Sequence, residues 1–150
     1  IVAMCFKRKA LFLENTFKVV FSLFSFYFIF AIFPSAGPQF YFEAADRAVP
    51  TNGYIFQQIM HAIQENAEQP TGAFPSSHVG ITVVILLLAR KSLPLFYKIC
   101  FPLAVILILS TVYIKAHYAA DAIFGILIAP IIVYLAAVMY NYPTKKDSII

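Results

Sequence analysis

Four long apolar runs interrupt this chain, and they decide what it can fold into. A helix that crosses a membrane needs about 20 apolar residues, with about 17 as the lower limit. The fourth run meets this length by itself. The first and third meet it if their flanking lysines extend to the interface, and the second if residues near Phe74–His78 complete its outer end. The runs cover Val19 to Phe33, about His78 to Ala89, Ile99 to Ile114, and Ala122 to about Tyr142.

The composition supports a membrane protein. Hydrophobic residues make up 61% of the 150 residues and charged residues only 12%, with a mean hydropathy of +0.81, whereas soluble domains carry about 25% charged residues. These values exclude disordered, coiled-coil, collagen-like and disulfide-scaffold classes. Because helices satisfy their own backbone in lipid, we expect an all-α, polytopic transmembrane helix bundle with four visible spans in a single domain over residues 1–150.

The basic residues indicate the orientation of this bundle. If four helices alternate in direction, nine lysines and arginines fall on one side and only Arg47 and Lys115 on the other. The basic side is therefore expected to be cytoplasmic, and Ser35–Ser77 and the turn at Lys115–Ala120 to face the periplasmic or extracytoplasmic side. Short basic clusters between apolar runs are typical of juxtamembrane loops, so the net charge of +4 predicts no nucleic-acid partner. The nine are Lys7, Arg8, Lys9, Lys18, Arg90, Lys91, Lys98, Lys145 and Lys146.

The segment from Ser35 to Ser77 is too long to be a simple connection. Pro34-Ser-Ala-Gly-Pro38 ends the first span. After Pro50, apolar residues recur at helical spacing from Tyr54 to Ile63, which predicts an amphipathic helix on the outer surface. His61 belongs to that helix, and we interpret it as an ordinary surface histidine.

The stretch Ala73-Phe-Pro-Ser-Ser-His78 is unusual before an apolar helix. A proline near a helix start sacrifices no hydrogen bond, so Pro75 is compatible with that position. The backbone N–H groups of Ser76, Ser77 and His78 would then converge at a helix N-terminus, where anions bind. The two serine hydroxyls add further donors.

A second unusual stretch runs from Ser110 to Asp121, across the turn between the third and fourth runs. His117 and Asp121 are four residues apart, so they share a face if a helix begins near His117. A carboxylate there can accept from one imidazole nitrogen and leave the other as a nucleophile. Either histidine alone could be a capped or interfacial residue, but both stretches lie on the same outer face. No cluster has metal-ligand spacing, and we expect neither a metal nor another cofactor. Cys5 and Cys100 are interpreted as buried apolar residues.

With these two stretches, the chain resembles the type 2 phosphatidic acid phosphatase (PAP2) superfamily over essentially its whole length. Pro75-Ser-Ser-His78 is similar to that family's proline-serine-glycine-histidine signature, with a serine in the glycine position. The spacing of Ser110, His117 and Asp121 matches the family's serine-arginine, histidine and aspartate signature. The resemblance implies that His117 is the nucleophile that forms a phosphohistidine, that Asp121 orients it, that His78 protonates the leaving group, and that Ser76 helps to hold the phosphate.

The chain departs from the family pattern at two signatures. Thr111 stands where the family has its phosphate-binding arginine, and the signature with an Arg-Pro pair has no counterpart. In having a threonine at this position, the chain is similar to the branch that includes inositol-phosphorylceramide synthases. The family core has six helices, so we expect its first one or two to lie upstream of Ile1.

A phosphate also needs positive charge in its transition state. Lys115, two residues before His117, is the first candidate and Arg47 the second, although either could be an ordinary interfacial residue. Ser77, Ser110 and Thr111 complete the expected phosphate-binding set.

Three functions are compatible with these residues. The leading one is an integral-membrane phosphohydrolase that cleaves a phosphomonoester or diphosphate of a lipid. The first alternative transfers the phosphoryl group to an alcohol, as a lipid phosphotransferase of the inositol-phosphorylceramide-synthase type does. The second is a non-catalytic membrane subunit with the same fold. The expected partners are a lipid phosphate and the membrane, and the sequence makes no prediction of an oligomeric state.

Overall fold

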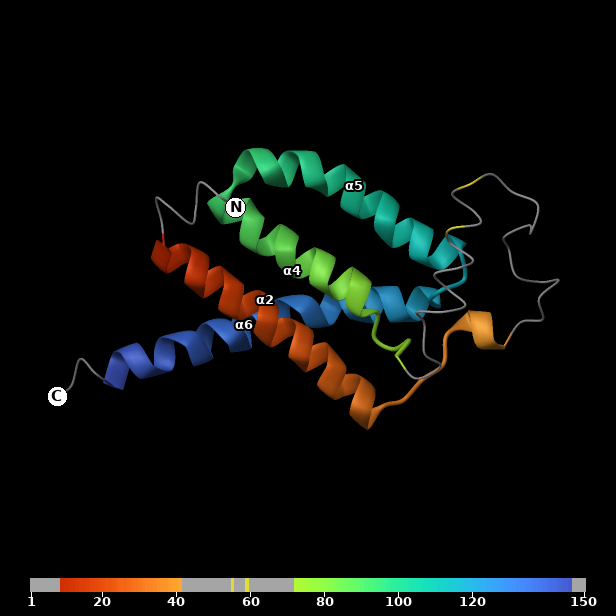
Figure 1. Ribbon diagram of the computed structural model, residues 1–150, viewed down its shortest axis with the longest axis horizontal. Helices are drawn as coiled ribbons and strands as arrows, with labels where there is room; N and C mark the ends of the chain where they lie inside the picture. Colours follow the sequence, from red (N-terminus) through yellow and green to blue (C-terminus); the bar gives the residue numbers. More distant parts are fainter. Residues whose placement is uncertain (1–8, 42–54, 56–58, 60–71, 147–150) are drawn as a thin grey trace.

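The protein folds into a bundle of α-helices that run in alternating directions (Figure 1). Because the directions alternate, one end of the bundle gathers the C-terminal ends of α2 and α5 and the N-terminal ends of α4 and α6. The computed structural model describes residues 9–41, 55, 59 and 72–146. The predicted all-α architecture is confirmed for the described residues. Its elements are α2 (Lys9–Ile32), the 3-10 helix η1 (Pro38–Phe40), α4 (Ser77–Ser92), α5 (Pro94–Tyr113) and α6 (Ala119–Lys146).

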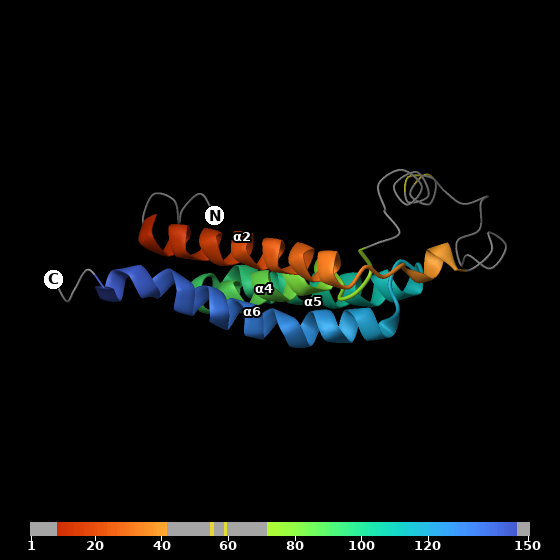
Figure 2. The same ribbon diagram turned by 90° about the horizontal axis from the view of Figure 1, so that it is seen from below.

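Helices α4 and α6 each contact the three other long helices of the bundle. Figure 2 shows α4 and α5 between α2 on one side and α6 on the other. Val79, Val84 and Ala89 are buried along α4. A side chain at Gly80 would collide with the ring of Phe26 on α2, so the glycine permits the close approach of these two helices.

Among the described residues, three helices are long and apolar enough to cross a membrane: α2, α5, and α6 from Ala119 to Tyr142. Helix α4, which corresponds to the second predicted span, is not among them, because it has only 16 residues. Large apolar side chains such as Phe28, Ile106 and Leu127 are more than half exposed on them. A soluble surface would not tolerate so extensive an apolar area, whereas lipid tails solvate it. These features establish an integral membrane protein.

Helix α4 differs from the span predicted for the second apolar run. We expected its outer end to be completed by residues near Phe74–His78, but the helix begins at Ser77 and continues through Arg90 and Lys91 to Ser92. Pro75 is buried just outside the helix, and residues 72–76 form a separate segment. With 16 residues, α4 is about 24 Å long.

Helix α2 begins earlier than the predicted start at Val19. It starts at Lys9 and includes Lys18, which forms an ion pair with Glu14 one turn earlier. This pairing lets Lys18 lie within the helix rather than at the end of a span. Arg90 and Lys91 lie in the last turn of α4, at the opposite end of the bundle from Ser77.

Several predictions concern residues outside the described part of the chain. The amphipathic helix falls in this region, where only Ile55 and Ile59 are described, both in helical conformation. His61, Arg47 and Cys5 also lie outside the described residues. Cys100 is a free, half-buried cysteine in α5.

Candidate active site

The two unusual stretches meet at one end of the bundle. His78 is the second residue of α4, and His117 lies in the turn that precedes α6. Their imidazole rings face each other with centroids 6.0 Å apart and planes inclined by 56°. His117 is 7% exposed, whereas His78 is exposed. A buried and an exposed imidazole thus lie side by side.

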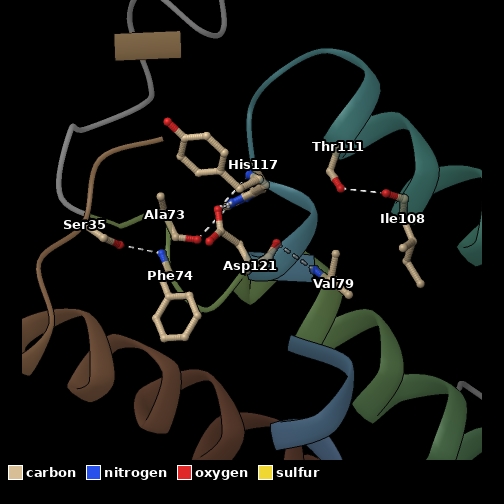
Figure 3. Close-up of polar contacts among 10 residues, drawn as sticks. Ser35, Ala73, Phe74, Val79, Ile108, Thr111, His117 and Asp121 are labelled. Carbon is tan, nitrogen blue, oxygen red and sulfur yellow. Dashed lines mark hydrogen bonds and ion pairs between the residues drawn. The ribbon is translucent and has the colours of Figure 1, made fainter. Parts of the chain in front are cut away.

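Two oxygen atoms lie near Nδ1 of His117. The carbonyl oxygen of Ala73 is 3.0 Å away, and Oδ2 of Asp121 is 3.7 Å away. Figure 3 shows all three residues converging. A carbonyl oxygen can only accept a hydrogen bond, so Nδ1 carries the proton. In the neutral ring Nε2 therefore keeps its lone pair, which is the form that can attack an electrophile.

The carboxylate of Asp121 has two neighbours. It is buried, shares a face with His117 as predicted, and its Oδ2 accepts a 2.8 Å hydrogen bond from the backbone N–H of Tyr118. An acidic side chain in the first turn that reaches back to the N-cap N–H stabilises a helix start. Asp121 therefore both caps α6 and supplies negative charge to the His117 ring.

Ser76 joins the start of α4 to the start of α6. Its N–H donates to the carbonyl of Asp121 over 3.0 Å, and its fully buried side chain accepts from Val79 N–H over 3.4 Å. The prediction of a free Ser76 N–H is therefore wrong, because the α4–α6 contact uses that group. Within the described part of the chain, the first-turn N–H groups of Ser77 and His78 have no partner.

The hydroxyls of Ser110 and Thr111 lie in the last turn of α5. Each donates to a carbonyl of its own helix, that of Leu107 or Ile108, over 2.8 Å. Figure 3 shows the Thr111 hydroxyl directed toward Ile108. The Thr111 carbonyl accepts from His117 N–H over 3.1 Å. The structure therefore uses Thr111 to fix the turn, and both hydroxyls would have to rotate to bind a phosphate.

Lys115 occupies an unusual backbone conformation in the same turn. Its φ of 57° is left-handed, and its N–H donates to the carbonyl of Val112 over 3.1 Å. This geometry is typical of a residue that ends a helix. The side chain is half-buried, two residues before His117.

Sequence reasoning missed three residues that surround the site. Ala73 contacts His117 through its carbonyl, and Ser35 bonds to the backbone of Ala73. Gly37 packs against Ala116, the residue before His117: a Cβ at Gly37 would lie 2.6 Å from the carbonyl oxygen of Ala116. For Ser35 and Gly37 the signal was the Pro34–Pro38 stretch, which was interpreted as the end of the first span. Among the described residues, no three His, Cys, Asp or Glu side chains gather as metal ligands would.

Comparison with known proteins identifies one family. A family model described as the PAP2 superfamily matches residues 1–135. No curated protein and no solved structure matches the chain.

Proposed function

The chain belongs to the PAP2 superfamily, and from this premise we propose that it is a membrane phosphohydrolase that cleaves a lipid phosphomonoester or diphosphate through a phosphohistidine. Membership supports a phosphatase-type activity in general. The observation that carries the finer proposal is the 3.0 Å contact between Nδ1 of His117 and the Ala73 carbonyl oxygen, from which we assign the proton to Nδ1. With Nδ1 hydrogen-bonded to the Ala73 carbonyl, the lone pair of Nε2 is available for attack.

The first half-reaction uses both histidines. Nε2 of His117 attacks phosphorus, the bond between phosphorus and the leaving oxygen breaks, and His78 donates a proton to that oxygen. The phosphorylated ring keeps its Nδ1 proton and gains positive charge. Asp121 Oδ2, 3.7 Å from Nδ1, stabilises that charge, as a buried carboxylate does for an imidazolium.

The second half-reaction restores the enzyme. His78, now neutral, accepts a proton from water as the water oxygen attacks phosphorus. The bond between phosphorus and nitrogen breaks, and inorganic phosphate leaves. Because His78 is exposed, it can exchange its proton with solvent between turnovers.

The phosphate oxygens need donors and positive charge. The N–H groups of Ser77 and His78 lie at the N-terminus of α4, where the helix dipole favours an anion. Lys115 is our first candidate for the cation that replaces the family arginine. Ser77, Ser110 and Thr111 remain candidate hydroxyl donors, and Arg47 remains a candidate cation. The Ser76 hydroxyl is a weaker candidate, because it is fully buried and accepts from Val79 N–H.

A lipid phosphotransferase is the second candidate function. It shares the first half-reaction but passes the phosphoryl group to an alcohol. Thr111 favours it, because a threonine in the position of the family arginine makes the chain similar to the inositol-phosphorylceramide-synthase branch. A non-catalytic subunit is less well supported, because it would need neither the paired rings of His78 and His117 nor a defined tautomer.

Labelling tests the proposed function. Purified wild-type protein in mixed micelles is mixed with ³²P-labelled phosphatidic acid and quenched in alkali. We expect a protein-bound label that is stable to base and labile to acid, as a phosphoramidate is, and that is absent from His117→Ala. Undiminished labelling of His117→Ala would refute the assignment. Adding an alcohol such as inositol distinguishes the two reactions, since a transferase forms the phosphoryl alcohol and a hydrolase forms inorganic phosphate.

A further inference from the structure

The connection that follows α2 grips the segment that precedes α4. Ser35 and Gly72 form an isolated parallel bridge. The backbone carbonyl of Ser35 accepts from Ala73 N–H over 3.0 Å, and its hydroxyl oxygen accepts from Phe74 N–H over 2.8 Å. One serine therefore holds two consecutive N–H groups, as Figure 3 shows for Phe74.

The same segment holds His117. Ala73 uses its N–H toward Ser35 and its carbonyl toward Nδ1 of His117 over 3.0 Å. The carboxylate of Asp121 lies 0.7 Å farther from that nitrogen, at 3.7 Å. The carbonyl is thus the closer acceptor. Its position depends on a segment that is not part of a helix and that needs external contacts to stay in place.

Two further contacts fix this arrangement. The ring of Phe74 packs edge-on against Phe124 of α6, with centroids 5.0 Å apart. Gly37 lies so close to the carbonyl oxygen of Ala116 that a Cβ there would be 2.6 Å from it. The connection after α2 therefore touches both the segment that contacts His117 and the residue that precedes His117.

We propose that Ser35 is a positioning residue that sets the tautomer of His117 by holding the Ala73 carbonyl on Nδ1. Ala73 N–H donates to the Ser35 carbonyl, and Phe74 N–H donates to the Ser35 hydroxyl. The Ala73 carbonyl in turn accepts from Nδ1 of His117. With the carbonyl in place, the proton stays on Nδ1 and the lone pair stays on Nε2. The catalytic consequence rests on the proposed function, but the tautomer does not.

The primary test is ¹⁵N NMR of the full chain in micelles with ¹⁵N-labelled histidine. The chain has only three histidines, so a His117→Gln spectrum assigns the His117 signals. In wild type we expect protonated Nδ1 and unprotonated Nε2. Ser35→Ala should shift the two His117 signals toward a mixture of tautomers, and Ser35→Thr, which keeps the hydroxyl, should recover most of the wild-type spectrum.

The matched control is Ser25→Ala. The hydroxyl of Ser25 donates to the Phe21 carbonyl within α2 over 2.8 Å, so its loss should leave the His117 signals unchanged. If turnover of phosphatidic acid is observed, Ser35→Ala should lower kcat about 5- to 10-fold with little change in KM. Ser25→Ala should keep wild-type kcat.

A second variant keeps the test decisive if Ser35→Ala does not fold. Asp121→Ala removes the competing acceptor, and the His117 proton should stay on Nδ1. Mixed tautomers in Asp121→Ala would show that the Asp121 carboxylate sets the position of the His117 proton, and would overturn the proposal. Unchanged His117 signals in a folded Ser35→Ala would overturn it too, as would equal losses in Ser35→Ala and Ser35→Thr. Wild-type protein without turnover or label would instead refute the proposed function, with the NMR result standing separately.

Discussion

The rings of His78 and His117 face each other across the junction of α4 and α6, with centroids 6.0 Å apart. The junction is held by backbone atoms, since Ser76 N–H donates to the Asp121 carbonyl over 3.0 Å. Each histidine lies within two residues of an N-terminal helix end. The relative position of the two rings is therefore set by two helix starts bonded to each other.

The proposed division of labour between the histidines gives the first prediction. His78→Ala is expected to slow phosphatidic acid turnover by about 10²–10⁴-fold, the usual range for a positioned acid or base. An aryl phosphate needs less protonation of its leaving group, so it should restore formation of the labelled intermediate in this variant. Rapid-quench labelling with both substrates measures this. An equal loss with both substrates would exclude His78 as the acid.

Asp121→Asn is expected to reduce turnover less than His117→Ala does. The Ala73 carbonyl still holds the Nδ1 proton, so the variant loses the negative charge but keeps the nucleophilic lone pair. The amide oxygen of asparagine can still accept from Tyr118 N–H, so stability should change little. Asp121→Ala should cost about 1 kcal/mol more in unfolding free energy. Steady-state kinetics and thermal unfolding check the two effects separately, and a loss as complete as that of His117→Ala would make the carboxylate indispensable.

Substitutions of Lys115 can separate the effect of its strained backbone on stability from the effect of its side-chain charge on turnover. Its left-handed φ of 57° suits glycine and disfavours side chains with a Cβ. Lys115→Gly is therefore expected to be more stable than Lys115→Ala by about 1 kcal/mol in thermal unfolding. Both variants remove the candidate cation, so both should lower turnover, and Lys115→Arg should keep most of it. Full activity in Lys115→Gly would eliminate the phosphate-binding role.

Gly125 is expected to tolerate no side chain. A Cβ there would lie 2.7 Å from the Ser76 carbonyl oxygen, which belongs to the backbone and cannot rotate away. Gly125→Ala should lower the unfolding free energy by about 1–3 kcal/mol and reduce turnover by displacing the start of α4. Gly72→Ala is the matched control, because among the described residues its Cβ would meet the Phe30 ring at 3.6 Å, an ordinary van der Waals contact. Equal stability of the two variants would contradict the tight α4–α6 contact.

The basic residues give a prediction of topology. We expect the site to face away from the cytoplasm, because nine of the 11 lysines and arginines fall on the other side. With Cys5 and Cys100 replaced by alanine, a cysteine at Gln64 should react with an impermeant thiol reagent on intact cells, and one at Lys146 should not. The reverse pattern would place the site on the cytoplasmic side.

Side-chain spacing predicted the part of the site that depends on helical periodicity. His117 and Asp121 share a face because they are four residues apart, and the apolar runs located α5 and α6. The contact between Ala73 and His117 was not predictable, because a backbone carbonyl looks the same at every residue. The early start of α2 was missed because Lys18 was interpreted as a lysine that flanks the first apolar run, although Glu14 lies one turn before it.

The length of α4 has a consequence for how substrate reaches the histidines. The hydrocarbon layer of a bilayer is about 30 Å thick, and 16 residues of helix cover about 24 Å of it. If α4 stands perpendicular to the bilayer with Arg90 and Lys91 at one interface, its start lies about 6 Å beneath the other. Under the proposed function, a lipid phosphate would then react without leaving its leaflet, and turnover would depend on the surface density of the substrate. Diluting the substrate with inert lipid would slow the reaction even at a constant bulk concentration.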